Sequence, residues 1–142
     1  MKLSVIGLGL IGGSFARALR AAGAVSEVVA CGRNPDALAR AIELGVADRV
    51  TTDPVDAVRD ADIVVLGVPL SAMRDLMAKI APALPAHAIV TDVGSTKQSV
   101  IADATATMGD ALSRFVPGHP IAGTERSGVE ASFAELFQER RV

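Results

Sequence analysis

Aromatic side chains are scarce in this sequence, whose 142 residues include four Phe and no Trp or Tyr. Half of the residues are nevertheless hydrophobic, so the core has to be built from Ala, Val, Leu and Ile. An aliphatic core of this kind suits a parallel sheet that helices cover on both faces. The length is that of one domain, able to bury about 68–70% of its unfolded surface. We therefore expect a single α/β domain.

Cysteine, histidine and clustered positive charge are scarce as well. The single cysteine, Cys31, excludes an internal disulfide and is typical of a reducing cytosol. Two histidines without paired His/Cys spacing cannot build a zinc site, so no metal is expected. The 14 basic and 16 acidic residues include no Lys/Arg block, which argues against nucleic acid or a membrane surface as partner.

Long apolar runs and hydrolase motifs are also missing. The sequence has no run of about 18 apolar residues, the length that would span a membrane. Its first residues enter a predicted strand without the basic segment, apolar region and cleavage site of a secretory signal. No Gly-x-Ser-x-Gly elbow indicates a serine hydrolase. We expect a soluble, cytoplasmic protein that acts on a small molecule.

The sequence is rich in glycine at its beginning, in Gly7-Leu8-Gly9-Leu10-Ile11-Gly12-Gly13. A strand over 3–6 precedes this GxGxxG pattern and a helix from about residue 11 follows it, which is the order of the Rossmann dinucleotide-binding fingerprint. Gly7 should allow the tight turn, Gly9 the close approach of a pyrophosphate, and Gly12 the close packing of helix on sheet.

The start of the first helix completes the predicted cofactor site. The backbone N–H groups near Leu10 and Ile11 and the positive end of the helix dipole would face the phosphates. A glycine-rich turn without a ligand is the alternative, but the flanking strand and helix favour dinucleotide binding.

The end of the second predicted strand, at 27–32, bears on cofactor choice. Here an acid would bind the ribose hydroxyls of NAD, whereas an arginine accommodates the extra phosphate of NADP. The sequence continues with Arg33 and Asn34 and has no acid until Asp36. We assign Arg33 and Asn34 to cofactor binding, and Arg33 favours NADP slightly over NAD. The alternative is that Arg33 stacks on the adenine of either cofactor.

The remaining pattern alternates helices and strands, as in a doubly wound, mostly parallel Rossmann-type sheet with helices on both faces. We expect helices near 35–44, 51–59, 71–80 and 98–108, and strands at 62–69, 87–93 and 115–117. Val68 and Pro69 end a buried strand, so they should lie on the rim of the glycine loop, where ligands bind in such sheets.

Two more segments bring polar side chains to this rim. The strand at 87–93 leads to Ser95, and that at 115–117 leads to a Gly- and Pro-rich loop with His119. His119 would lie beside the nicotinamide and is our candidate catalytic base; the alternative is a histidine bonded to its own loop. Lys97 could attract an anionic substrate or be solvated. His87, at the opposite strand end, should be a surface residue.

Three segments, 7–14, 92–97 and 118–128, together resemble the prephenate/arogenate dehydrogenases of tyrosine biosynthesis. The segment 31–35 also resembles their cyclohexadienyl dehydrogenase branch. The resemblance implies oxidative decarboxylation of prephenate or arogenate: hydride passes from the ring carbinol carbon to NAD or NADP, the ring carboxylate leaves as carbon dioxide, and an aromatic ring forms.

The resemblance also implies roles for individual residues. His119 matches the histidine that takes the hydroxyl proton, and Ser95 matches a serine that orients the substrate hydroxyl or the histidine. Ser95 or Thr96 could also cap the following helix. Thr124 and Glu125 fall in the segment associated with substrate contact and gating, and Glu125 matches an acid that in some members pairs with an arginine of a second domain.

Members of this family are about twice as long, with a second, mostly helical domain that dimerises and completes the substrate site. We therefore expect residues 1–142 to be the amino-terminal dinucleotide-binding domain, which binds cofactor but turns over substrate poorly, and to form a homodimer only with that second domain. Two other interpretations remain: a two-domain Rossmann dehydrogenase of β-hydroxyacids or imines, and a stand-alone dinucleotide-binding sensor. The choice between prephenate and arogenate stays open.

Overall fold

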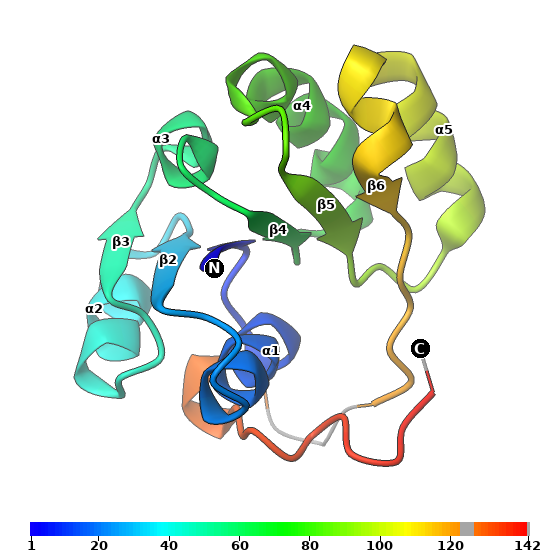
Figure 1. Cartoon of the computed structure of the whole chain (residues 1–142). Coiled ribbons are helices and arrows are strands. Elements are labelled where there is room, and N and C mark those ends of the chain that lie inside the picture. The colour runs from blue at the N-terminus through cyan, green and yellow to red at the C-terminus, as the bar shows by residue number, and fades with distance from the viewer. Residues whose placement is uncertain (123–126, 142) are drawn as a thin grey trace.

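A computed structural model describes residues 1–122 and 127–141 of the chain. Six parallel strands form one sheet in the order β3-β2-β1-β4-β5-β6, with the order reversing between β1 and β4 (Figure 1). The predicted Rossmann-type, doubly wound α/β fold is thus confirmed. The strands are β1 (Lys2–Ile6), β2 (Glu27–Cys31), β3 (Arg49–Thr51), β4 (Ile63–Leu66), β5 (Ile89–Asp92) and β6 (Phe115–Val116).

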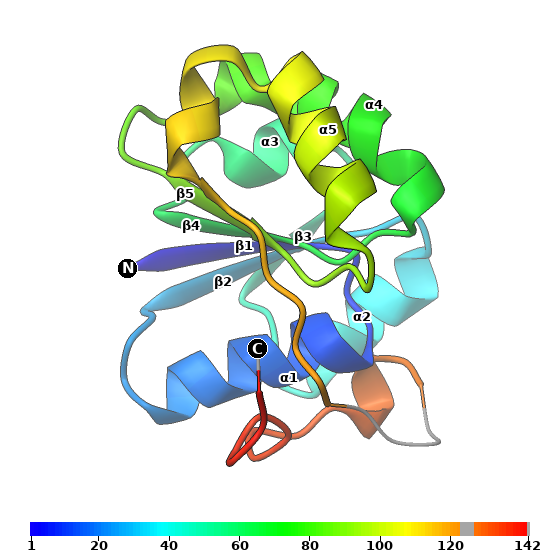
Figure 2. The same cartoon turned by 90° about the vertical axis from the view of Figure 1, so that its right-hand side faces the viewer.

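Five α-helices in the described residues connect the strands: α1 (Leu10–Ala21), α2 (Pro35–Glu43), α3 (Pro54–Val58), α4 (Leu70–Ile80) and α5 (Lys97–Thr107). Three 3₁₀ turns, η1 (Ala81–Ala83), η2 (Gly109–Arg114) and η3 (Val129–Ala131), complete the elements. Helices α1 and α2 cover one face of the sheet, and α3, α4 and α5 cover the other (Figures 1 and 2). Within the described ranges, no helix has the length and apolar character needed to cross a membrane.

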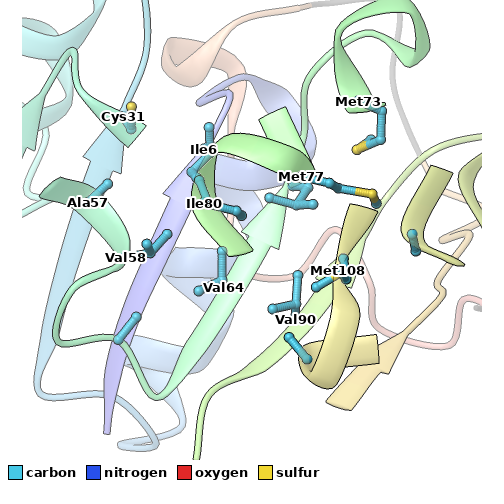
Figure 3. Close-up of a cluster of buried hydrophobic side chains, with 14 of the residues drawn as sticks. Ile6, Cys31, Ala57, Val58, Val64, Met73, Met77, Ile80, Val90 and Met108 are labelled. Carbon is cyan, nitrogen blue, oxygen red and sulfur yellow. The ribbon is translucent and has the colours of Figure 1, made fainter. Parts of the chain in front are cut away.

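The strands alternate their side chains between two hydrophobic clusters. Leu3 and Val5 of β1 pack with α1 and α2, whereas Ile6 joins the cluster beneath α3, α4 and α5. Figure 3 shows this second cluster, in which Met73 and Met77 are fully buried. The expectation of a core made of Ala, Val, Leu and Ile was incomplete, because flexible methionines also fill the space between helices and sheet.

Strand β3 is the one strand of the described residues that the pattern did not indicate. It has three residues at the edge of the sheet, where Val50 pairs with Ala30 of β2 and Arg49 is exposed. A strand this short shows too little alternation to be recognised before its partner is known. The helix expected at 51–59 accordingly begins later, at Pro54.

The C-terminal segment, residues 127–141, folds back against α1 (Figures 1 and 2). The backbone N–H of Phe133 donates to Ser14 Oγ over 3.0 Å, and Arg17 Nε donates to Ser132 Oγ over 2.8 Å. A Cβ on Gly13 would lie 2.9 Å from that of Ser132. The second glycine of the Gly-Gly pair therefore makes room for this segment, a role that the sequence did not indicate.

Replacing Gly12 by Ala should destabilise the fold. The new methyl would lie 2.8 Å from Val5 Cγ1 and 3.1 Å from the carbonyl oxygen of Gly7. Overpacking costs about 1–3 kcal/mol, which exceeds the roughly 0.5–1 kcal/mol that Ala gains over Gly in a helix. Urea unfolding should show a lower free energy of unfolding. In a Val5→Ala background the same change should cost less, and a strictly additive result would contradict this contact.

Candidate functional site

A cleft of about 710 Å³ opens where the strand order reverses. It is formed by the carboxyl ends of β1, β2 and β4 together with parts of α4 and the residues before α3. Its described lining includes several residues predicted for the cofactor: Gly7, Arg33, Val68 and Pro69. Ligands of open α/β sheets bind at this reversal, so the location of the cleft agrees with a dinucleotide site.

Of the glycine loop, Gly7 lines this cleft, whereas residues 9–12 are not among the described lining residues. Gly7 has a φ of +89°, and a Cβ there would lie 2.6 Å from the backbone of Gly67 at the end of β4. A Cβ on Gly9 would instead meet no described atom within 4 Å. Gly7 and Gly12 are thus required by the fold itself, whereas Gly9 leaves open space above the loop, which fits the approach of a pyrophosphate.

The first turn of α1 has the properties of an anion site. Gly9 is its N-cap and supplies no capping side chain, and the turn contains no acidic residue. The N–H groups of Leu10 and Ile11 precede the first intrahelical donor, so they remain available to an oxyanion. These residues could hold the diphosphate of a dinucleotide, as predicted.

The end of β2 forms the outer part of the cleft. Arg33 is exposed there, and Lys79 and Asp75 of α4 are also among the lining residues. Asn34 lies outside the cleft lining and caps α2, accepting from the N–H groups of Asp36 and Ala37 over 3.0 and 3.3 Å. A structural role for Asn34 is therefore clear, and its contact with cofactor remains a prediction.

Cys31, at the last position of β2, also lines this cleft. Its side chain is almost fully buried. Burial, together with the nearby carboxylates of Asp53 and Asp56, raises the pKa of the thiol from its ordinary 9.0 to about 11. Cys31 is therefore a protonated, unreactive thiol at neutral pH.

A second polar cluster lies at the ends of β5 and β6. Asp92 is 1% exposed and is the only charged side chain buried in the described residues. Its Oδ2 accepts from the N–H of Gly94 over 2.8 Å, and its Oδ1 accepts from the N–H of Gly118 over 3.1 Å. The ammonium group of Lys97 pairs with Oδ2 and also donates to the carbonyl oxygen of Gly118.

This cluster changes the interpretation of Lys97. Its side chain is 27% exposed and is committed to Asp92 and to the loop before His119. Its ammonium group is therefore neither fully solvated nor unpaired and available to an anionic substrate. The sequence predicted Asp92 as a strand residue without a functional role. The pattern that could have indicated its role is an acid at the carboxyl end of a buried strand, followed by a lysine five residues later.

Ser95 and His119 are the residues that follow the two glycines bound to Asp92. Both are exposed at the same rim of the sheet. The N-cap of α5 is Thr96, and no side chain within the described part of the chain caps this helix. Thr96 is thus the N-cap residue, as considered, but its side chain makes no capping hydrogen bond.

The other predicted positions lie away from this rim or outside the described structure. Thr124 and Glu125 lie outside the described residues, so their assignment to substrate contact and gating stays a prediction. His87 is at the opposite edge, where its Nε2 lies 2.7 Å from Asp62 Oδ1. Its side chain is 64% exposed, which confirms the expected surface position.

Sequence comparison assigns this arrangement to a family. Residues 15–142 match the sequence profile described as prephenate dehydrogenase, nucleotide-binding domain. The chain belongs to the prephenate dehydrogenase family. It is 46% identical over 142 residues to the cyclohexadienyl dehydrogenase of Zymomonas mobilis, an alignment that covers 99% of this chain and 47% of that protein.

Solved structures of similar proteins agree. A structure of prephenate dehydrogenase from A. aeolicus with hydroxyphenyl propionate and NAD+ matches with a TM-score of 0.88 and 36% identity, covering 99% of this chain and 48% of that one. Arogenate dehydrogenase of Synechocystis matches with a TM-score of 0.87 and 32% identity over 99% of this chain and 48% of that one. The chain thus spans about half the length of these relatives and corresponds to their nucleotide-binding portion.

Gly9→Ala should weaken dinucleotide binding without unfolding the domain. The new methyl meets open space in the protein but would occupy the predicted path of the pyrophosphate. Calorimetric titration should give dissociation constants for NAD and NADP at least about tenfold higher, a loss of about 1.4 kcal/mol. The urea midpoint should change less than for Gly12→Ala. Unchanged affinity for both cofactors would mean that the pyrophosphate does not pass over Gly9.

Cys31 should resist thiol reagents in the folded protein and react freely in denaturant. Because its folded pKa is about 11 against an ordinary 9.0, its contribution to stability is complete below pH 9 and is lost as the pH rises toward 11. Between pH 9 and pH 11, the free energy of unfolding of Cys31→Ala should therefore fall less steeply than that of the unsubstituted protein. Rapid labelling of the native protein at neutral pH would contradict this picture.

Proposed function

We propose that this chain is the cofactor-binding half of an enzyme that oxidatively decarboxylates prephenate or arogenate with NAD or NADP. The observation that carries the proposal is that the cleft and the loops bearing Ser95 and His119 lie at the same rim of the sheet, the carboxyl ends of its parallel strands. The names of the relatives support this reaction, because they include cyclohexadienyl, prephenate and arogenate dehydrogenases. The single buried cysteine suits a cytoplasmic enzyme.

The residues of the cleft fit a dinucleotide. The open space over Gly9 and the uncapped first turn of α1 can receive the diphosphate, and the rim at Val68 and Pro69 can border the route to the nicotinamide. When bound, the oxidised nicotinamide supplies the hydride acceptor of the reaction. The protein's task is then to bind the substrate hydroxyl and remove its proton.

We assign that proton transfer to His119. A neutral imidazole within hydrogen-bond reach of the ring hydroxyl takes its proton while hydride leaves the carbinol carbon, a contribution of typically 10²–10⁴-fold. The bond to the ring carboxylate breaks, carbon dioxide departs and the ring becomes aromatic. Ser95, whose side chain does not cap α5, orients the hydroxyl or the imidazole by a hydrogen bond.

We propose that NADP is accommodated at least as well as NAD. The end of β2 presents the exposed guanidinium of Arg33 to the cleft. Neither Gly32 nor Asn34 beside it offers a carboxylate to bind the ribose hydroxyls. The extra phosphate of NADP would gain a charge-assisted contact with Arg33.

The substrate site needs a second part. His119 and Ser95 are exposed on this domain, whereas proton and hydride transfer need a site that excludes water. The relatives are about twice as long, and we infer that their remaining half supplies the far wall of the pocket and the homodimer contact. The isolated 142-residue chain should therefore bind dinucleotide while oxidising prephenate poorly or not at all.

A chimera tests this proposal. Joining residues 1–142 to the remaining half of the Zymomonas relative should yield NAD- or NADP-dependent oxidation of prephenate, and His119→Ala in the chimera should lower kcat by about 10²–10⁴-fold. His87→Ala, which removes a surface histidine at the opposite edge, is the matched control and should leave kcat unchanged.

Two results would count against the proposal. A chimera that binds NADP tightly and yet oxidises neither prephenate nor arogenate would favour a cofactor-binding sensor. A loss of less than tenfold in His119→Ala would favour another Rossmann dehydrogenase, whose acid or base lies in the second half.

The cofactor assignment has its own test. Arg33→Ala should weaken NADP binding by about 1.5–3 kcal/mol, the range for a hydrogen bond to a charged group, and leave NAD binding nearly unchanged. Arg74→Ala, which removes an exposed arginine of α4 outside the cleft lining, should affect neither. Equal losses for both cofactors would indicate that Arg33 stacks on adenine instead.

A further inference from the structure

One carboxylate joins the two loops that carry the proposed catalytic residues. Gly94 precedes Ser95 and Gly118 precedes His119, and the N–H groups of both glycines donate to Asp92, each to a different oxygen. The loops leave neighbouring parallel strands, β5 and β6. The distance between the backbones that lead into Ser95 and His119 is therefore set by the width of a single carboxylate.

Lys97 makes this connection tighter. Its ammonium group binds Asp92 Oδ2 and the carbonyl oxygen of Gly118. Gly118 is consequently held on both sides, its N–H by the carboxylate and its carbonyl by the lysine. The side chain of Asp92 has no exposed surface, and hydrogen bonds to charged groups are stronger when they are shielded from water.

Close packing leaves little freedom at the two glycines. A Cβ on Gly94 would lie 2.9 Å from Asp92 Oδ2, and one on Gly118 would lie 2.8 Å from the backbone oxygen of Asp92. Real Cβ atoms do not approach this closely. The two loops thus contact Asp92 so tightly that only glycine fits at either position.

We propose that Asp92 is a positioning residue of this enzyme, which acts through Gly94, Gly118 and Lys97 to fix Ser95 and His119 relative to each other. The proposal rests on the function proposed above. Asp92 itself is buried away from the substrate and exchanges no proton with it. A displacement of about 1 Å in a catalytic group can cost 10²-fold in rate, so the precision of this contact bears directly on catalysis.

The two histidines of the chain provide a crossed control. Asp92 holds the loop of His119, whereas Asp62 contacts His87 at the opposite edge and accepts from the N–H of Lys2 over 2.7 Å. In the 142-residue chain, Asp92→Asn should shift or broaden the NMR signals of the His119 imidazole and of the Gly118 amide, and leave those of His87 in place. Asp62→Asn should shift or broaden the signals of His87 and leave those of His119 and Gly118 in place.

Kinetics of the chimera then separate positioning from simple destabilisation. An amide at position 92 would turn an N–H donor toward a glycine N–H or the Lys97 ammonium, so Asp92→Asn should lower kcat by about 10²-fold while the dissociation constant for NADP stays nearly constant. Lys97→Met should also lower kcat, and Lys97→Arg, which keeps the charge and its donors, should restore much of it.

Each outcome decides the proposal. Unchanged kcat in a folded Asp92→Asn variant, with His119→Ala inactive, would overturn the positioning role and leave the proposed function standing. If His119→Ala is fully active, both fail together. Should Asp92→Asn not fold, the Lys97 pair decides: equal activity of the Met and Arg variants would overturn the proposal.

Discussion

The carboxyl ends of β1 and β4 approach so closely that neither accepts a side chain. A Cβ on Gly7 would lie 2.6 Å from the backbone of Gly67, and one on Gly67 would lie 2.7 Å from the Gly7 carbonyl oxygen. The N–H of Gly67 also donates to the carbonyl oxygen of Ile6 over 2.7 Å. This contact fixes the point where the strand order reverses. The cleft, the start of α1 and the route for a dinucleotide all depend on it.

The second constraint is Asp92, at the end of β5, the strand that pairs with β4. A buried carboxylate is costly unless it is paired and hydrogen-bonded, and here two glycine N–H groups and one ammonium group satisfy it. Gly7 and Gly67 thus shape the cleft in which we propose that the cofactor lies, and Asp92 joins the two loops to which we assign the chemistry. The two constraints share one rim because all six strands are parallel.

Local signals explain how much the sequence could predict. The glycine spacing and the apolar strands depend on neighbours in the chain, so the fold and the cofactor loop were predictable. Contacts between distant residues were not: Gly118 meets Asp92 across 26 positions, and Phe133 meets Ser14 across 119. Lys97 was ambiguous for this reason, since its partner carbonyl is 21 residues away. The three residues of β3 show no pattern without β2.

The most direct test of the account is a crystal structure of the 142-residue chain with NADP. The diphosphate should lie at the first turn of α1 above Gly9, the extra phosphate beside Arg33, and the nicotinamide at the rim where Gly118 leads into His119. A cofactor bound in this cleft with its nicotinamide directed away from His119, or bound at another surface, would contradict the account.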